Sequence, residues 1–327
     1  MPKPVVLLYE PIHAQALELL GRHAEVRMAP GLEEDQLLGI LGDVQGIIIR
    51  ANGKVSRRLM QAAPQLKVVA RHGVGVEAID RQAAAELGIA VVNTPDANVE
   101  SVAEQCLVMM IALAKRLRLA DRAIRAGDWE ARYRLIGNEL LGKTLGLVGF
   151  GRIGRRLAAM CRQGLAMSIL YSDVVSYPEA EQELQAGKVE LGRLLREADF
   201  VSLHTPLLAE TRGLIGEAEL RSMKPTAFLL NTARGPVVDQ AALERALEQG
   251  WIAGAGLDVY DPEPLPADSK LLLLDNVVLS PHMAAHTDEA LLRMAMVVTD
   301  VLAVIEGRPP TNPVAWTGAG SGAAPVT

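Results

Sequence analysis

Residues 144–173 read TLGLVGFGRIGRRLAAMCRQGLAMSILYSD, and this stretch decides the fold. An apolar run leads into a turn with Gly149, Gly151 and Gly154, an amphipathic segment follows, and a second apolar run ends at Asp173. Strand, glycine-rich turn, helix, strand and acidic residue in this order are typical of a unit that binds a dinucleotide. The alternative is a glycine-rich turn that serves packing alone.

The three glycines each have a steric role in such a unit. Gly149 allows the tight turn, Gly151 lets the backbone approach a pyrophosphate, and Gly154 lets the helix pack closely on the strand. The N–H groups that open the helix after Phe150 then face the phosphates with the positive end of the helix dipole.

Asp173 predicts which dinucleotide is bound. It lies about 20 residues beyond the glycines, where a carboxylate accepts hydrogen bonds from the adenosine ribose and repels a 2′-phosphate. Val174 and Val175 follow, and no arginine stands beside Asp173 in the sequence to receive such a phosphate. We therefore expect NAD rather than NADP as the cofactor.

A second glycine-containing segment, residues 137–144 with the sequence GNELLGKT, fits the letters of the phosphate loop of nucleotide hydrolases. That loop follows a strand and opens a helix. Here Lys143 and Thr144 run directly into the apolar residues 145–148. We interpret the match as coincidental.

Composition limits the classes of function. The chain has 327 residues, 50% hydrophobic and 22% charged, which suits two domains with sizeable cores. A net charge of −6 without a basic block argues against a nucleic-acid partner. Cys106 and Cys161 are the only cysteines, and we expect both as buried thiols in a reducing cytoplasm. No apolar stretch reaches membrane-spanning length, and residues 1–10 are too short for a signal peptide, so no membrane partner is expected.

Short runs rich in Val, Ile and Leu alternate with amphipathic segments of helix length, and they do so in two series. This pattern predicts an α/β fold with two Rossmann-like, doubly wound parallel sheets. The expected strands of the first series are residues 5–9, 25–28, 46–50, 66–71 and 90–93. Those of the second series are residues 145–148, 168–172, 200–204, 227–231, 254–258 and 277–280. We expect residues 1–97 and 287–327 to form a flavodoxin-like substrate-binding domain, and residues 98–286 to form an inserted NAD-binding Rossmann domain.

Three further segments complete the expected organisation. Residues 101–126 are expected to form a long helix that is apolar on more than one face, which favours burial by a second subunit and hence a homodimer. Residues 287–307 are expected to form one closing helix of the first domain. The Gly-, Ala- and Ser-rich tail, residues 317–327, is expected to be disordered.

Three loop segments of the second half carry residues suited to hydride chemistry, which needs a proton donor and acceptor beside the reacting oxygen and a group that holds the substrate. Residues 231–239, NTARGPVVD, place Arg234 after a strand, where its guanidinium suits a carboxylate. Residues 258–266, DVYDPEPLP, place Glu263 between two prolines, and residues 279–287, LSPHMAAHT, place His282 after a strand. Taken singly, the better interpretations are an exposed loop arginine for Arg234, a rigid surface turn for Glu263 and a core histidine for His282.

Together the three segments resemble the D-2-hydroxyacid dehydrogenase family, NAD-dependent enzymes that include 3-phosphoglycerate, glycerate and D-lactate dehydrogenases and glyoxylate and hydroxypyruvate reductases. The resemblance covers residues 5–313. It implies that Arg234 binds the substrate carboxylate and carbonyl, that His282 is the general acid and base, and that Glu263 hydrogen-bonds to His282. A neighbouring carboxylate stabilises the imidazolium and keeps a proton available at neutral pH.

The resemblance also implies a set of cofactor contacts. Asp258 would contact the nicotinamide amide, and Arg152 and Ile153 would meet the pyrophosphate. The remaining members of this set line the cofactor cleft: Val74, Thr205, Thr232, Ala233 and Ala285. No metal site is expected.

The first domain resembles the substrate-binding portion of the family. Residues 71–80, RHGVGVEAID, match the loop whose backbone N–H groups, here of Val74 and Gly75, take the substrate carboxylate. Residues 93–105, NTPDANVESVAEQ, match the segment that crosses into the nucleotide domain and place Asn98 near the substrate. Glu100 and Ala285 depart from the family pattern, which usually has small or hydroxyl residues at the first position and often has glycine at the second.

Arg50 and Arg71, both at expected strand ends, align with cationic positions that phosphoglycerate dehydrogenases present to a distal phosphate. Our best expectation is therefore an enzyme that resembles 3-phosphoglycerate dehydrogenase. Arg132 and Arg134, after Trp129, are candidates to add charge from a neighbouring subunit; the alternative for all these arginines is a surface salt bridge. A hydroxypyruvate or glyoxylate reductase, or a dehydrogenase of another anionic acid such as sulfolactate, fits the same motifs.

A different class of function also fits the architecture. Corepressors of the C-terminal-binding-protein type share it, and in them NAD binding controls assembly onto peptide motifs. They also keep the arginine, glutamate and histidine set, so these residues do not separate a scaffold from an enzyme. We expect an enzyme that closes at hinges near residues 97 and 287 and so excludes water from the reaction.

Overall fold

A computed structural model describes residues 2–316. The chain divides into two compact units, and each is described by itself. The split unit comprises the residues up to Asn98 together with those from His286 onward, and the central unit is Val99–Ala285. The expectation of disorder for residues 317–327 lies outside the described residues.

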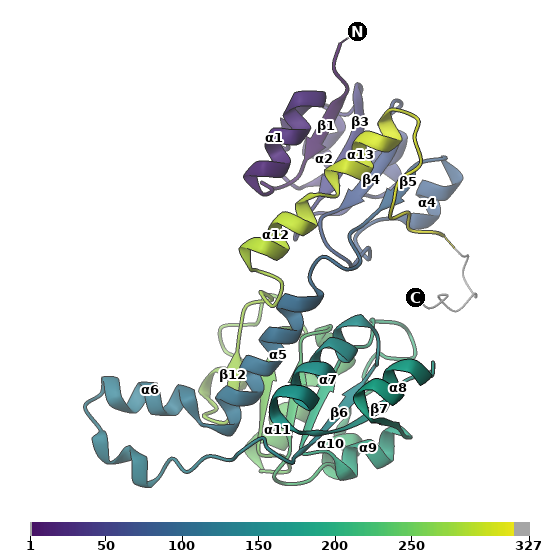
Figure 1. The fold of residues 1–327 in the computed structure, drawn as a ribbon. Helices are drawn as coiled ribbons and strands as arrows, with labels where there is room; N and C mark the ends of the chain where they lie inside the picture. The colour runs from purple at the N-terminus through teal and green to yellow at the C-terminus, as the bar shows by residue number, and fades with distance from the viewer. Residues whose placement is uncertain (1, 317–327) are drawn as a thin grey trace. The chain divides into compact units, whose positions relative to one another are not determined.

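The split unit contains a five-stranded, fully parallel sheet with the order β2-β1-β3-β4-β5 (Figure 1). This is the flavodoxin-like order, in which the connections reverse beside the first strand. The strands are β1 (Val5–Leu8), β2 (Glu25–Met28), β3 (Val44–Ile49), β4 (Val68–Arg71) and β5 (Ala90–Val92).

Helices cover both faces of this sheet, because its inner strands are apolar on both sides. One face packs on α2 (Glu34–Leu38), α3 (Arg57–Gln61) and α4 (Arg81–Glu86). The other packs on α1 (Ala14–His23), α12 (Asp288–Ala295) and α13 (Val298–Ile305). The C-terminal helices thus belong to the same core as the first strand.

The central unit contains a seven-stranded parallel sheet with the order β12-β11-β10-β9-β6-β7-β8. Its order reverses between β6 and β9, which is the Rossmann arrangement with one added edge strand. The strands are β6 (Thr144–Val148), β7 (Ser168–Ser172), β8 (Ala186–Lys188), β9 (Phe200–Leu203), β10 (Phe228–Asn231), β11 (Gly254–Leu257) and β12 (Val277–Leu279).

The central sheet is also covered on both faces. One face packs on α5 (Val99–Ala114), α7 (Arg152–Leu165) and α8 (Pro178–Leu184) (Figure 1). The other packs on α9 (Leu191–Glu197), α10 (Glu217–Ser222) and α11 (Gln240–Glu248). Short 3-10 turns η2 (Gly235–Val237) and η3 (Lys270–Leu273) lie in the loops. The predicted fold class, two doubly wound parallel-sheet α/β domains, is confirmed.

The expected helix over residues 101–126 is wrong as a single element. It is two helices, α5 and α6 (Leu117–Arg125), separated at Arg116, whose backbone is left-handed with φ 52°. The carbonyl of Ala114 accepts a hydrogen bond from the Asn138 amide at 2.8 Å. A returning segment therefore caps α5 at the point where a continuous helix would need that carbonyl.

The expected closing helix over residues 287–307 is also two helices, α12 and α13. At the junction the Thr299 hydroxyl donates to the Met296 carbonyl at 2.8 Å, and the Thr299 amide donates to it at 3.0 Å. The carbonyl is thereby withdrawn from regular α-helical bonding, which separates the helices.

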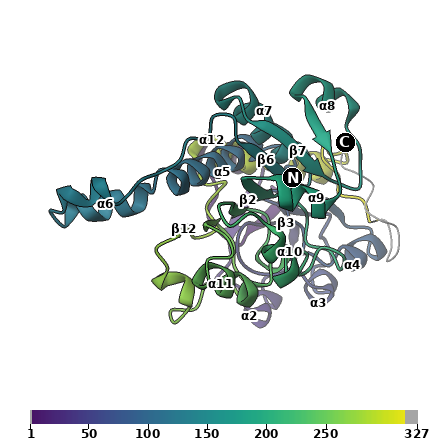
Figure 2. The ribbon, with the colours of Figure 1, turned by 90° about the horizontal axis from the view of Figure 1, so that it is seen from below.

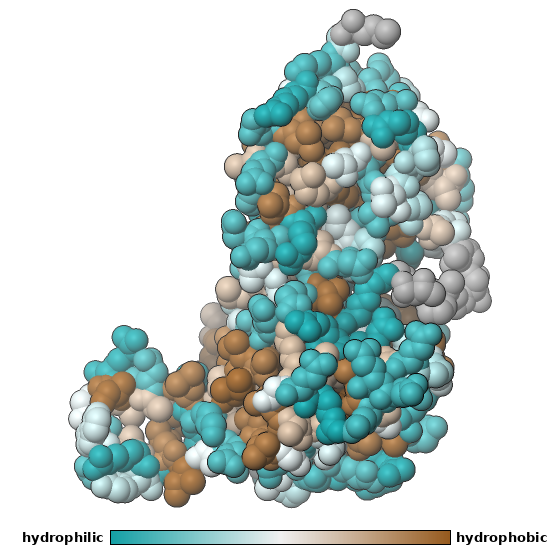
Figure 3. All heavy atoms as spheres, viewed as in Figure 1, coloured by the Kyte–Doolittle hydropathy of each residue, from teal (hydrophilic) through white to brown (hydrophobic). Residues whose placement is uncertain are grey.

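The α6 helix and the following turn η1 (Trp129–Tyr133) form an arm that projects from the rest of the central unit in both ribbon views (Figures 1 and 2). No residue of α6 is buried. Large apolar side chains on the arm and just after it are exposed, among them Trp129 (62%) and Ile136 (74%). Hydrophobic residues gather on the arm and on the neighbouring side of the central unit (Figure 3).

Both cysteines are buried and unpaired, and burial raises the pKa of Cys106 to about 11 and that of Cys161 to about 12. Among the described residues, no helix combines the length and the apolarity that crossing a bilayer requires.

Candidate active site and cofactor site

The glycine-rich turn follows β6 and opens α7. Gly149 has φ 93°, and a Cβ atom there would lie 2.8 Å from the carbonyl of His204, which follows β9. A Cβ atom at Gly154 would lie 2.6 Å from the Gly149 oxygen. These two glycines are therefore required by the packing of the protein itself.

Gly151 is different. It has no protein atom within 4 Å of the position that a Cβ atom would take, and its φ of −68° suits any residue. Open space over a glycine at the start of α7, where Arg152 and Ile153 open the helix, is what an approaching pyrophosphate needs. The turn therefore fits a dinucleotide, and packing alone does not explain Gly151.

Asp173, just after β7, faces this turn. Its Oδ2 accepts a hydrogen bond from the Phe150 amide at 2.7 Å, and its Oδ1 accepts one from the Val175 amide at 3.0 Å. Each oxygen keeps a further lone pair. The carboxylate is thus fixed at the carboxyl edge of the sheet, where the adenosine ribose is expected.

The sequence analysis missed the basic side chains around Asp173. A surface pocket beside it is lined by residues from the ends of β7 and β8 and the start of α9: Ser172, Asp173, Lys188, Val189, Glu190, Gly192, Arg193 and Arg196. No arginine stands directly beside Asp173 in the sequence, but the fold brings Lys188, Arg193 and Arg196 to the same pocket. The short strand β8, which carries Lys188, was not expected.

Thr205 and Thr232 lie at the carboxyl ends of β9 and β10. The Thr205 hydroxyl is buried and has no hydrogen-bond partner in the structure, so it suits a bound group. The Thr232 hydroxyl instead lies 3.1 Å from the Cys106 Sγ of α5, and the adjacent Ala233 amide donates to the Asn231 side chain at 3.1 Å.

Asp258, at the end of β11, is fully buried and its carboxylate binds the turn that contains His282. It accepts hydrogen bonds from the amides of Met283 (2.9 Å) and Ala284 (2.8 Å) and from the Ser280 hydroxyl (2.5 Å). His282 itself has a left-handed backbone, with φ 49°. Asp258 thus holds His282 in an unfavourable backbone conformation, and its contact with nicotinamide stays a prediction.

His282 and Glu263 form a pair. The His282 Nδ1 lies 2.9 Å from the Glu263 Oε2, and the Tyr260 amide donates to the other oxygen, Oε1, at 3.0 Å. Burial would raise the pKa of Glu263, but the hydrogen bonds from His282 and Tyr260 outweigh it and hold that pKa below its ordinary value. Glu263 is therefore an anion at neutral pH, and the His282 Nε2 is left to face another group.

Arg234 lies close to this pair and lowers the pKa of Glu263 further by its charge. Its backbone carbonyl accepts a hydrogen bond from the Asn231 side chain at 3.0 Å, and its Nη1 donates to the Ala233 carbonyl at 2.7 Å. The central unit thus brings Arg234, Glu263 and His282 together.

In the split unit, Arg50 and Arg71 lie at the ends of the neighbouring strands β3 and β4, where Ile49 is the register partner of Arg71. Burial, together with the charges of Arg50 and Arg71, lowers the pKa of the adjacent His72 to about 4. The guanidinium groups of Arg50 and Arg71 therefore both lie near the His72 imidazole, which is neutral at physiological pH. The Arg50 Nη1 also donates to the Pro11 carbonyl at 3.0 Å.

The loop that contains Val74 and Gly75 is tied to the end of β5. The Gly73 amide donates to the Thr94 hydroxyl at 3.2 Å, and the Asn93 side chain donates to the Val74 carbonyl at 2.8 Å. Within residues 2–316, the amides of Val74 and Gly75 donate no hydrogen bond. They are available for an anion.

Asn98, Glu100 and Ala285 lie at or near the boundaries between the two units. Asn98 ends the first segment of the split unit, and its Oδ1 is buried with no hydrogen-bond partner in the structure. Glu100 pairs with Arg156 of α7 through two contacts of 2.6 and 2.7 Å, so this departure from the family pattern ties α5 to α7. Ala285 is the last residue of the central unit.

On the arm, the Arg132 guanidinium lies 4.6 Å from the ring centre of Tyr133 and 5.5 Å from that of Trp129. Arg134 forms an ion pair with Asp128 at 2.5 Å. Neither arginine lies in the group formed by Arg234, Glu263 and His282.

Comparison with known proteins agrees with this geometry. The family model "D-isomer specific 2-hydroxyacid dehydrogenase, NAD binding domain" matches residues 107–284. The chain belongs to this family. It is thus a nicotinamide-dependent 2-hydroxyacid dehydrogenase, as the sequence predicts.

Relatives of this dehydrogenase match nearly all of its chain. It is 41% identical over 318 residues to a glyoxylate reductase of Korarchaeum cryptofilum, covering 95% of both chains. It is 39% identical to a D-3-phosphoglycerate dehydrogenase of Archaeoglobus fulgidus, covering 94% of this chain and 59% of that one. The solved structure of the TT0316 protein of Thermus thermophilus has 40% identity and a TM-score of 0.89, covering 95% of this chain and all of that one.

Proposed function

We propose that this dehydrogenase interconverts small anionic 2-hydroxy acids and their 2-keto acids with NAD, using His282 as general acid and base. The observation that carries the proposal is the His282–Glu263 pair, 2.9 Å apart, beside Arg234. A histidine oriented by an anionic carboxylate is the usual device for moving a proton near neutral pH.

Each residue of this group has a distinct task. When bound, the cofactor would supply or accept the hydride at the substrate carbon. His282, with its Nδ1 turned to Glu263, presents Nε2 to the substrate oxygen, donating a proton during reduction and accepting it during oxidation. Arg234 binds the substrate carboxylate and carbonyl through its planar fork of donors. We assign the split unit to substrate binding and the central unit to the cofactor.

The substrate class is set by the split unit. The free amides of Val74 and Gly75 suit a carboxylate, and Arg50 and Arg71 suit a second anionic group. We therefore favour a doubly anionic acid such as 3-phosphoglycerate or sulfolactate. Glyoxylate and hydroxypyruvate, which lack a second anionic group, are the alternative, and the names of several relatives favour glyoxylate.

A panel assay tests this function through NADH absorbance, with 3-phosphoglycerate, D-glycerate, D-lactate and sulfolactate in oxidation and hydroxypyruvate and glyoxylate in reduction. A doubly anionic substrate is supported if the enzyme turns over such acids and if Arg50→Gln and Arg71→Gln each abolish that turnover. Preference for glyoxylate or hydroxypyruvate makes the protein a reductase. Absence of all turnover, with cofactor-dependent assembly, favours the scaffold function.

Cofactor choice gives a sharper prediction. Replacing Asp173 by alanine removes the charge that repels a 2′-phosphate and leaves Lys188 and Arg196 in the same pocket. We expect the ratio of kcat/KM for NADP to that for NAD to rise by roughly tenfold or more, since one repulsion near a protein surface amounts to about 1–4 kcal/mol. Asp268→Ala, at an exposed acidic residue outside this pocket, is the control. An unchanged ratio in Asp173→Ala would remove Asp173 from this role.

We also propose a cytoplasmic homodimer that assembles through the arm. The support is a group of large apolar side chains that are exposed on the arm and just after it, Leu117, Ile124, Trp129 and Ile136. The double variant Leu117→Glu/Ile136→Glu should sediment as a monomer. Leu273→Glu, at an exposed leucine outside the arm, should not change the sedimentation coefficient. A wild-type monomer at micromolar concentration would contradict the proposal.

A further inference from the structure

The loop that carries Glu263 has no regular secondary structure. After β11 ends at Leu257, Asp258 to Tyr260 are still buried, and the next residues, Asp261, Pro262 and Glu263, are exposed. The Tyr260 amide, three residues earlier in the chain, donates a hydrogen bond to one oxygen of the Glu263 carboxylate. The orientation of this carboxylate toward His282 therefore depends on the backbone conformation of the loop. A contact that fixes the backbone of this loop therefore also fixes the Glu263 carboxylate.

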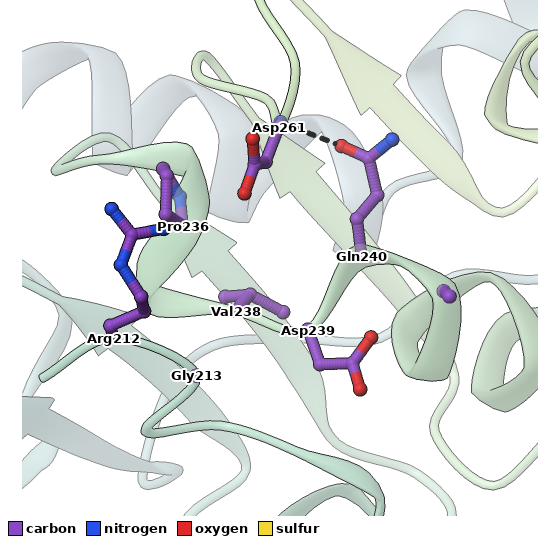
Figure 4. Close-up of a pocket in the computed structure, with 8 residues that line it drawn as sticks. Arg212, Gly213, Pro236, Val238, Asp239, Gln240 and Asp261 are labelled. Atoms are coloured by element: carbon purple, nitrogen blue, oxygen red, sulfur yellow. Dashed lines mark hydrogen bonds between the residues drawn. The ribbon is translucent and has the colours of Figure 1, made fainter.

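Two contacts from the connection between β10 and α11 reach this loop. At Gly235 the backbones approach so closely that a Cβ atom would overlap the Tyr260 carbonyl. Five residues later, the Gln240 Oε1 accepts a hydrogen bond from the Asp261 amide at 3.0 Å (Figure 4). Figure 4 shows the Gln240 side chain running from the start of α11 to the Asp261 backbone, beside a pocket lined by Arg212, Pro236 and Asp239.

Gln240 is itself well anchored. It is the first residue of α11, whose N-terminus is capped by Asp239 through a 3.0 Å hydrogen bond from the Ala242 amide. The preceding Val237 and Val238 are buried, and Val238 pairs with Ile215. The amide donor of Asp261 requires an acceptor, so the side-chain oxygen of Gln240 must be the atom that faces it.

We propose that Gln240 is a positioning residue for the acid–base pair: by accepting the Asp261 amide hydrogen, it fixes the loop that aims the Glu263 carboxylate at His282. Arg234 lies in the segment between β10 and α11, just before Gln240. Gln240 therefore also fixes the position of the acid–base pair relative to Arg234. This proposal rests on the acid–base function proposed above.

Two substitutions separate the acceptor from the bulk of the side chain. Gln240→Met removes the acceptor at nearly constant length, and Gln240→Glu keeps one and suits a helix N-terminus. In Gln240→Met we expect kcat for keto-acid reduction to fall by about three- to tenfold, the worth of one neutral hydrogen bond, with KM nearly unchanged. The pH at half-maximal turnover should move lower, because a carboxylate that is no longer aimed stabilises imidazolium less. Gln240→Glu should restore both quantities.

The ¹⁵N resonance of the His282 Nδ1 is a readout that needs no turnover, because it reports the hydrogen bond to Glu263. It should be the same in wild type and Gln240→Glu, shifted in Gln240→Met, and shifted most in Glu263→Gln. Combining Gln240→Met with Glu263→Gln should add nothing to Glu263→Gln alone, because both act through one carboxylate. Thermal melting checks the fold, and Gln240→Ala serves as a second variant without the acceptor.

The outcomes decide between the two proposals. A Gln240→Met protein with a wild-type Nδ1 resonance and pH profile overturns the role of Gln240, as does a Gln240→Glu protein impaired as strongly as Gln240→Met. If the Nδ1 resonances follow the expected order while Glu263→Gln leaves turnover unchanged, the positioning stands and the acid–base function fails.

Discussion

Replacing His282 by asparagine should lower kcat by about a hundredfold to ten-thousandfold, the range that general acid–base catalysis contributes. Asparagine is chosen because His282 has a left-handed backbone at φ 49°, which asparagine tolerates and alanine does not. The variant should therefore keep its melting temperature and its NADH affinity while losing proton transfer. Steady-state kinetics with the best substrate of the panel, together with NADH fluorescence, measure both.

The control for this variant is His23→Asn, at the exposed end of α1, which should retain full turnover. His282→Ala should lose stability as well as turnover, because alanine has no polar side chain to support the left-handed backbone, which costs about 1–2 kcal/mol. Full turnover in His282→Asn would show that another group moves the proton.

Replacing Arg234 by lysine should raise KM for the keto acid and lower kcat/KM by at least about thirtyfold. Lysine keeps the charge but not the planar fork that binds a carboxylate through two parallel hydrogen bonds, and truncating a partner of a buried charge pair costs about 2 kcal/mol or more. Because lysine keeps the positive charge beside Glu263, the pH profile should stay nearly constant. Initial rates over a range of pH test both parts.

Arg212→Lys is the matched control, since Arg212 is exposed on the neighbouring pocket and contacts no residue of the acid–base pair. It should leave KM unchanged. If Arg234→Lys lowers kcat alone, Arg234 acts on the reacting oxygen in the transition state rather than in substrate capture.

Strand ends were predictable because apolar runs in a parallel sheet stop at polar residues that face the ligand edge. Asp173, Asn231 and Asp258 each end such a run, and the structure places each at the end of its strand or directly after it. The strand β8 has no apolar run, because it is a three-residue edge strand, and its contribution of Lys188 to the pocket beside Asp173 was missed with it.

Features that depend on contacts between distant residues were not predictable. The left-handed backbone of His282 is supported by hydrogen bonds to Asp258, more than twenty positions earlier, and a histidine carries no local signal for it. The break at Arg116 likewise depends on Asn138 reaching the end of α5. The order of motifs along the chain predicted which residues form the site, and tertiary contacts determine how they are held.

The split unit has a consequence for how the protein is made. Its first sheet needs α13 to cover one face, a Lys67 contact with the Ile305 carbonyl (3.0 Å) and a bridge between Val92 and Pro313. A ribosome releases all of the central unit before it releases these partners, so the usual order of cotranslational folding from the N-terminus is reversed. Residues 5–98 of the split unit are therefore synthesised before the helices α12 and α13 that complete the cover of their sheet, and one face of that sheet is covered by α1 alone until the ribosome has released the central unit.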